Sequence, residues 1–228
     1  MDAAIGTPSA GATERTASAL RERIVTGALP PGTALREVAV AEELGVSRNT
    51  LREAFRRLAW ENLVDIERHK SAVVKMMSTE DIRDIYLVRR TIELKAIEES
   101  ALASPDSLIR LRQMADSVDQ ASSDDDWEGV ATAGLRFHQA IVSTLGSPRL
   151  DATFVPIIAQ IRLAFAPAIN QEQFQKPFAV RDLEICDLIL SGSRAAAGMA
   201  LHSYLRDAEQ ILSDLVQTGS PTAKTTTS

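Results

Sequence analysis

Apolar side chains recur along most of this chain at three- and four-residue intervals, and this spacing predicts amphipathic helices and a mainly α fold. Helices are expected over residues 14–25, 37–44, 47–60, 79–103, 106–121, 126–145, 148–168, 177–191 and 193–217. Convincing strand patterns occur only at residues 63–67 and 72–76, and the polar turn 68–71 between them predicts a β-hairpin.

The order of these elements divides the chain into two domains, which its length of 228 residues also favours. Residues 14–77 hold short helices and the hairpin. Residues 78–218 hold long helices joined by short links, a pattern typical of an all-α bundle of six to seven helices. Residues 1–13 and 219–228 are small, polar and aperiodic, so we expect a disordered arm and a disordered tail.

The stretch "LREVAVAEELGVSRNTLREAFRRL" carries the signals of a helix-turn-helix. Gly45 is suited to end the first helix, and Ser47 is a good N-cap for the second. The apolar residues of the second helix fall at i, i+3, i+4 and i+7 and form its predicted buried face: Leu51, Ala54, Phe55 and Leu58. The hairpin that follows would be the wing of an N-terminal winged helix-turn-helix.

Positive charge gathers on the opposite face of that second helix, although the whole chain has a net charge of −6. Arg48, Arg52 and Arg56 follow one another at four-residue intervals and form one stripe. Such a stripe can be an ordinary solvated surface. Together with the turn before it and the basic wing tip after it, the stripe favours contact with DNA phosphates and base edges. The basic residues of the wing tip are Arg68, His69 and Lys70.

The composition of the chain indicates the cellular compartment in which we expect the protein. No apolar run approaches the roughly 20 residues that a membrane-spanning helix needs. The N-terminus lacks the basic and apolar segments of a signal peptide. Cys186 is the only cysteine, so no intrachain disulfide can form. We therefore expect a cytoplasmic protein with no membrane partner.

Three motifs in residues 16–77 strongly resemble the winged-helix domain of the GntR family of bacterial transcription regulators: "IVTGALPPGTALRE", "LGVSRNTLREAFRRL" and "ENLVDIERHKSAVV". The resemblance implies that Arg48 and Arg52 contact bases, and that Ser47 and Thr50 bond phosphates. The basic residue expected near the first helix of the motif is Arg36. The candidate DNA-contacting residues are Arg36, Ser47, Arg48, Asn49, Thr50, Arg52, Arg56, Arg68, His69 and Lys70. The chain departs from the family in the wing, where His69 or Ser71 stands in place of a common glycine.

The second domain resembles the FCD effector domain of the FadR-like subfamily through "DIYLVRRTIE", "FHQAIVSTLGSPRL" and "SGSRAAAGMALHSYL". The resemblance implies a homodimer and a small ligand inside the bundle, usually an organic acid. It often implies a divalent metal held by an Asp-x3-His pair and two further histidines. Here His138 matches the histidine of the pair, but Gly134 stands at the aspartate position. Asp182 and Tyr204 stand at the other two positions, so we expect no metal cofactor, with His138 and Asp182 as weak candidates for a divalent ion.

Two arginines in otherwise apolar stretches, Arg89 and Arg162, also need an anionic partner if they are buried. Glu93 lies four residues after Arg89 and could pair with it internally, so a ligand and a protein carboxylate remain open alternatives for both arginines. The candidate effector-binding residues are Arg89, His138, Arg162, Asp182 and Tyr204.

These patterns together predict a ligand-responsive transcription regulator, a repressor by its family resemblance, that binds a palindromic double-stranded DNA operator as a homodimer. Its effector would be a small, anionic metabolite. One alternative is a ligand-independent architectural DNA-binding protein, which would not need so large a helical bundle. Another is a cysteine-dependent enzyme that uses Cys186, but this residue lies in an apolar helical run that is typical of a packed core. We therefore do not expect an enzyme.

Overall fold

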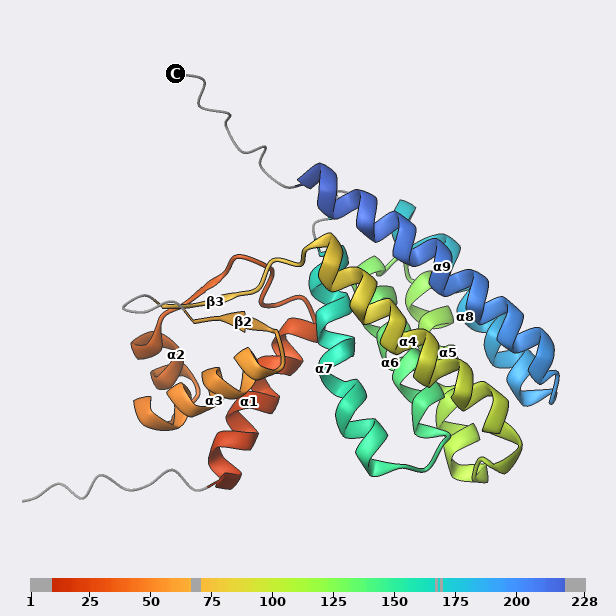
Figure 1. The fold of residues 1–228 in the computed structure, drawn as a ribbon, viewed down its shortest axis with the longest axis horizontal. Helices are drawn as coiled ribbons and strands as arrows, with labels where there is room; N and C mark the ends of the chain where they lie inside the picture. The colour runs from red at the N-terminus through yellow and green to blue at the C-terminus, as the bar shows by residue number, and fades with distance from the viewer. Residues whose placement is uncertain (1–9, 67–70, 167, 169, 220–228) are drawn as a thin grey trace, which may run out of the picture.

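A small N-terminal unit of helices and a sheet lies beside a larger helical bundle in the computed structural model of the chain (Figure 1). The structure describes residues 10–66, 71–166, 168 and 170–219. The predictions for residues 1–9, for the wing tip Arg68, His69 and Lys70, and for the tail from residue 220 onward lie outside the described residues.

The N-terminal unit has the predicted helix-turn-helix. Its elements are α1 (Ala10–Val25), β1 (Ala34–Leu35), α2 (Glu37–Glu43), α3 (Arg48–Trp60), β2 (Val64–Asp65) and β3 (Ala72–Val74). Gly45 takes a φ of +63° after α2, where a glycine avoids the steric cost of a Cβ atom. The Ser47 side chain caps α3 by accepting a hydrogen bond from the Thr50 amide at 3.1 Å. The four predicted apolar residues of α3 are all buried, which confirms the predicted face.

The sheet has three antiparallel strands in the order β1-β3-β2, one more than the predicted hairpin. Val64 pairs with Val74 in the hairpin, and Ala34 pairs with Val73 across the added edge. The strand β1 is only two residues long and follows a Pro-Gly turn, so it carries no alternating pattern that the sequence could reveal. Its pairing with β3 secures the segment between α1 and α2.

The bundle begins after Ser78, whose side chain and that of Asp81 form a reciprocal capping box. Its elements are α4 (Thr79–Glu99), the 3-10 turn η1 (Ser100–Leu102), α5 (Pro105–Ser123), α6 (Trp127–Ser143), α7 (Pro148–Phe165), α8 (Gln171–Leu190) and α9 (Arg194–Gly219). The four helices α5 to α8 each begin after a residue whose side chain accepts a hydrogen bond from the first turn: Ser104, Asp126, Ser147 and Asn170.

Three boundaries of the structure differ from the predicted ones. The helix α1 starts at Ala10, so residues 10–13 are helical and do not belong to a disordered arm. The helix α9 continues to Gly219, one residue into the predicted tail. The helix α8 starts at Gln171 instead of residue 177, because the cap at Asn170 sets its beginning and Pro177 is accommodated inside it. Pro177 is the seventh residue of α8, beyond the first turn, so it cannot donate the helical hydrogen bond to the Gln173 carbonyl.

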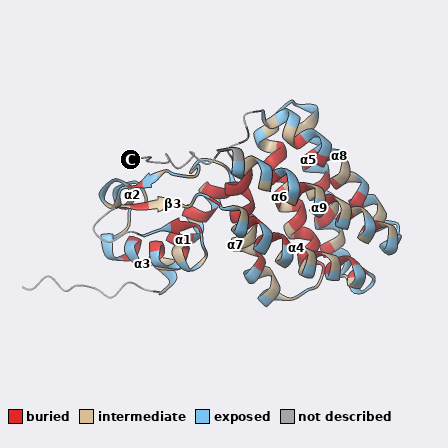
Figure 2. Ribbon diagram, turned by 45° about the horizontal axis from the view of Figure 1, so that its top comes forward, coloured by how far each residue is buried: buried red, intermediate tan, exposed pale blue. Residues whose placement is uncertain are grey.

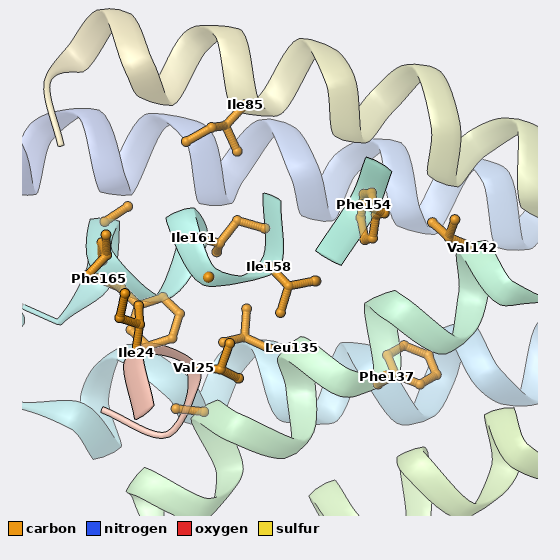
Figure 3. Packing of buried hydrophobic residues seen from close by; sticks show 14 of the residues in the cluster. Ile24, Val25, Ile85, Leu135, Phe137, Val142, Phe154, Ile158, Ile161 and Phe165 are labelled. Atoms are coloured by element: carbon orange, nitrogen blue, oxygen red, sulfur yellow. The ribbon is translucent and has the colours of Figure 1, made fainter. Parts of the chain in front are cut away.

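Buried residues form the inner faces of both units and belong to one continuous hydrophobic core (Figure 2). The C-terminal end of α1 supplies Ile24 and Val25. These side chains lie beside Leu135 of α6 and Ile161 and Phe165 of α7 (Figure 3). The two units are therefore packed against each other and not merely joined by a linker.

Candidate DNA-binding surface and effector cavity

The predicted arginine stripe lies on the open face of α3. The side chains of Arg48, Arg52 and Arg56 are each more than half exposed. They leave the helix opposite its buried apolar face, so a duplex could approach them without any rearrangement of the core. The exposed position of the stripe suits the insertion of α3 into a major groove.

Carboxylates on the protein already hold these arginines. The Nε atom of Arg52 donates to both carboxylate oxygens of Glu37 at 3.0 Å, and Arg48 lies 3.5 Å from the same carboxylate. Arg56 pairs with Glu53 on its own helix. The hydrogen bond from Arg52 lowers the pKa of Glu37 below its ordinary value, which keeps this group ionised. DNA would therefore have to replace the contact with Glu37.

The remaining predicted DNA contacts flank this stripe. Arg36 is exposed immediately before α2, and Asn49 is exposed in the first turn of α3. Ser47 is exposed, but its hydroxyl caps the helix and lies 2.8 Å from the hydroxyl of Thr50. Thr50 itself is buried. The hydroxyls of Ser47 and Thr50 therefore order the beginning of the helix in addition to any role at a phosphate.

A small cavity lies inside the bundle between α4, α6, α7, α8 and α9. Its volume is about 40 Å³. Four of the five predicted effector residues line it: Arg89, His138, Asp182 and Tyr204. The rest of its wall is mainly aromatic and aliphatic, with Phe165, Phe174 and Phe178 as its largest apolar side chains. The fold therefore brings together four of the positions that the resemblance to the family indicated.

A chain of buried polar groups runs along one wall of this cavity. Arg89 donates through Nε to Glu93 at 2.6 Å and through Nη1 to the Tyr86 hydroxyl at 3.2 Å. The other carboxylate oxygen of Glu93 lies 2.6 Å from Nδ1 of His138. On its far side, His138 presents Nε2 to Asp182 Oδ1 at 3.4 Å, a distance at which neither atom has a hydrogen-bond partner among the described residues. Arg89 therefore has the internal partner Glu93 that the sequence offered.

Burial and neighbouring charge act in opposite directions on these groups. Burial raises the pKa of Glu93, but the charges of Arg89 and His138 outweigh it, so the pKa of Glu93 is lowered overall. Burial lowers the pKa of His138, but the Glu93 carboxylate outweighs it and the pKa is raised overall. Burial also raises the pKa of Asp182, and its contact with His138 compensates only in part. Asp182 is thus the acid whose charge the site satisfies least.

The residues present do not fit the divalent metal that the family often holds. Burial raises the pKa of the Tyr204 phenol well above its ordinary value, so this side chain is a poor metal ligand. A Cβ atom at Gly134 would lie 3.2 Å from Asp182 Oδ2, so an aspartate at that position would crowd a second carboxylate against the first. Among the described residues, no group of three or more His, Cys, Asp or Glu could hold a metal ion.

Arg162, the fifth predicted effector residue, lies elsewhere. It is absent from the described lining of the cavity and is buried at the junction of the two units. Its guanidinium pairs with Glu128, and its Cζ atom lies 5.2 Å from the centroid of the Phe165 ring. Gly27, in the turn after α1, packs directly against it, since a Cβ atom there would lie 2.1 Å from Nη2. Arg162 therefore joins the DNA-binding unit to the bundle.

Comparison with known proteins matches both halves of the chain to known protein families. Residues 12–74 match the profile of the bacterial regulatory proteins of the gntR family, and residues 84–207 match the FCD domain. The chain belongs to the GntR family. Its FadR-like organisation, with a winged helix-turn-helix followed by a helical FCD domain, is that expected from the sequence motifs.

Relatives of this GntR-family protein are similar over most of its length. The gluconate operon transcriptional repressor of Bacillus subtilis is 26% identical over 212 residues, which cover 88% of this chain and 85% of the repressor. An HTH-type regulator from the TAR-I ttuE-ttuC' intergenic region of Agrobacterium vitis is 34% identical over 141 residues, or 59% of this chain and 81% of that protein. The crystal structure of a GntR transcriptional regulator from Rhodococcus sp. RHA1 is 33% identical, with a TM-score of 0.81, and covers 92% of this chain and 100% of its own.

The GntR-family protein is thus a transcription regulator and not an enzyme. Cys186 agrees with this conclusion, because it is fully buried and burial raises the pKa of its thiol to about 11. A thiol with so high a pKa is a poor nucleophile at neutral pH. In the described part of the chain, no helix combines the length and apolar character needed to cross a bilayer.

Proposed function

We propose that this GntR-family regulator represses transcription by binding a palindromic operator as a homodimer, and that a small molecule in the bundle cavity alters this binding. The observation that carries the proposal is the shared wall between the cavity and the DNA-binding unit. Leu135, Ile161 and Phe165 line the cavity and also pack against Ile24 and Val25 of α1.

This shared wall supplies a physical route for the response. A ligand that enlarges the cavity must move side chains of its lining, because the interior is close-packed, and Leu135, Ile161 and Phe165 of α6 and α7 belong to that lining. Those side chains support the C-terminal end of α1. In turn, α1 holds the end of α3, since Arg21 donates to both carboxylate oxygens of Glu61 at 2.8 and 2.7 Å. The orientation of α3 would thus depend on the contents of the cavity.

We infer a homodimer because one protomer presents only one recognition helix to DNA. One recognition helix contacts only a half-site, so a twofold-symmetric pair is needed for useful specificity. We assign base contacts to Arg48 and Arg52, and phosphate contacts to Arg56 and the wing. The bundle would supply most of the dimer interface through α4.

The experiment that tests this proposal combines two measurements on the intact chain. Fragments of genomic DNA selected by the protein should contain an inverted repeat, and a footprint on one such fragment should be symmetric about its centre. Sedimentation at micromolar concentration should give a dimer, free and on DNA. A monomer that protects an asymmetric site would refute the proposal.

A further inference from the structure

The positive charge that a ligand carboxylate would need in the cavity is already used. Among the described residues that line the cavity, Arg89 carries the one permanent positive charge. Glu93 binds it through both oxygens, at 2.6 and 3.5 Å, and both side chains are almost completely buried. A ligand carboxylate that displaced Glu93 would leave a buried carboxylate without its partner, which is strongly unfavourable.

Three atoms of the described cavity lining lack a hydrogen-bond partner, His138 Nε2, Gln175 Nε2 and Asp182 Oδ1, and one of them belongs to an acid. Asp182 is 2% exposed, and its Oδ1 atom has no hydrogen-bond partner among the described residues. Gly134 faces its other oxygen, and a Cβ atom at this glycine would lie only 3.2 Å from Oδ2, so the absence of a side chain lets α6 and α8 approach closely beside the carboxylate. A buried carboxylate oxygen without a donor favours a ligand that supplies one.

The charges of the lining point in the same direction. When His138 is neutral, Arg89 and Glu93 cancel and Asp182 leaves one negative charge. When His138 is protonated, the four groups are neutral together. A carboxylate ligand adds an uncompensated negative charge in both states, whereas an ammonium balances Asp182 once His138 has released its proton. Burial raises the pKa of Asp182, and the neighbouring charges of His138 and Arg89 offset this increase only in part.

The walls of the cavity suit the rest of such a ligand. The ring centroids of Phe178 and Tyr204 lie 4.9 Å apart, and those of Phe174 and Phe178 lie 5.6 Å apart. Aromatic faces attract organic cations and bury short carbon chains. The Nε2 atom of Gln175 has no hydrogen-bond partner among the described residues and offers one neutral donor to a ligand oxygen.

We propose that the effector of this regulator is a compact amine, bound as an ammonium that donates to Asp182 Oδ1, and not a carboxylic acid. Its carbon chain would pack on Phe174, Phe178 and Tyr204. This assignment rests on the proposed function only in that it treats the cavity as the effector site.

Three probes of nearly equal size test the charge preference: ethylammonium chloride, ethanol and sodium acetate, at matched ionic strength. The volume of about 40 Å³ holds roughly three water-sized groups, so probes with three or four heavy atoms are suitable. At about 50 mM and a Kd near 10 mM, ethylammonium should raise the Tm of the wild type by about 2–4 °C, whereas acetate should not. Asp182→Asn should abolish the increase. Glu184→Gln, which removes an exposed acid from the same helix, should leave the increase unchanged.

An equal Tm increase with ethanol, an increase with acetate, or none with ethylammonium would overturn the proposal on the wild type alone, even if Asp182→Asn did not fold. An undiminished response in a folded Asp182→Asn protein would overturn it as well. The footprint and sedimentation experiments report separately on the regulator. A symmetric footprint together with a Tm increase in acetate would refute the proposal of an amine effector and leave the proposed function standing. A Tm increase in ethylammonium without operator binding would refute the proposed function and leave the amine proposal standing.

Discussion

Replacement of Gly27 by alanine should loosen the junction between the DNA-binding unit and the bundle. Gly27 has a φ of +82°, and a Cβ atom there would lie 2.1 Å from Nη2 and 3.0 Å from Cζ of Arg162. Gly32 is a matched control in the same loop region, because its φ is +80° but nothing lies within 4 Å of its Cβ position. The two substitutions share the backbone strain, and only the first forces a buried guanidinium to move.

The expected magnitudes follow from these contacts. A left-handed conformation costs an L-residue about 1–2 kcal/mol, so Gly32→Ala should lower the free energy of unfolding by that amount. Gly27→Ala must also weaken the pairing of Arg162 with Glu128, a charged contact whose value is reduced because the Glu128 side chain is 63% exposed. This contact adds about 1–2 kcal/mol, for a total of about 2–4 kcal/mol.

Urea unfolding followed by tryptophan fluorescence measures both losses. Trp127 precedes Glu128 in α6 and should report on the junction. In an Arg162→Met background, which removes the guanidinium but keeps much of the apolar side chain, the loss caused by Gly27→Ala should fall to that of Gly32→Ala. Equal losses for the two glycines in the wild type, or an unchanged Gly27→Ala loss in the Arg162→Met protein, would refute this reasoning.

Three further predictions concern the DNA surface and the buried polar chain. Arg52→Ala should cost about 1–3 kcal/mol of operator binding and relax the base preference at one position; equal losses on matched and scrambled DNA in a binding titration would contradict a base contact. Glu37→Gln should tighten binding to all DNA sequences, because Arg48 and Arg52 lose a competing carboxylate. Binding titrations at several salt concentrations measure this effect, and an unchanged affinity would contradict the prediction. The pKa of His138 is raised in the folded protein, so its contribution to stability is present below the ordinary pKa of about 6.5 and is lost as the pH rises through the raised value. The free energy of unfolding should therefore decrease as the pH rises above about 6.5 in the wild type and change less in His138→Gln. Equal pH dependence of the two proteins in urea unfolding would contradict this prediction.

The DNA-binding unit was largely predictable because its signals are local. The turn at Gly45, the cap at Ser47 and the apolar positions of α3 all lie within a few residues of the structure that they specify. The strand β1 and the beginning of α8 were missed for opposite reasons. The two-residue strand β1 exists only through its pairing with β3. The helix α8 begins at the cap Asn170 although Pro177 in the sequence argued against a helix before that residue.

The residues of the cavity were likewise predictable only in part. The motif positions of His138, Asp182 and Tyr204 could be read from the sequence, and the fold brings all three to one cavity. The sequence could not decide the partners of the two buried arginines. Arg89 had a candidate in Glu93, but the choice between Glu93 and a ligand depended on α6 placing His138 against the second oxygen of that carboxylate.

Arg162 shows the limit most clearly. Its apolar neighbours in the sequence correctly indicated burial, yet they carried no information about the turn at Gly27 that packs against it. Helix periodicity and capping arise from atoms within one or two turns of the backbone, so the sequence by itself determined the helices and the exposed arginine stripe of α3. The partner of a buried charge is set by which helices meet and at what distance, and only the packing of α1 against α6 and α7 decided that.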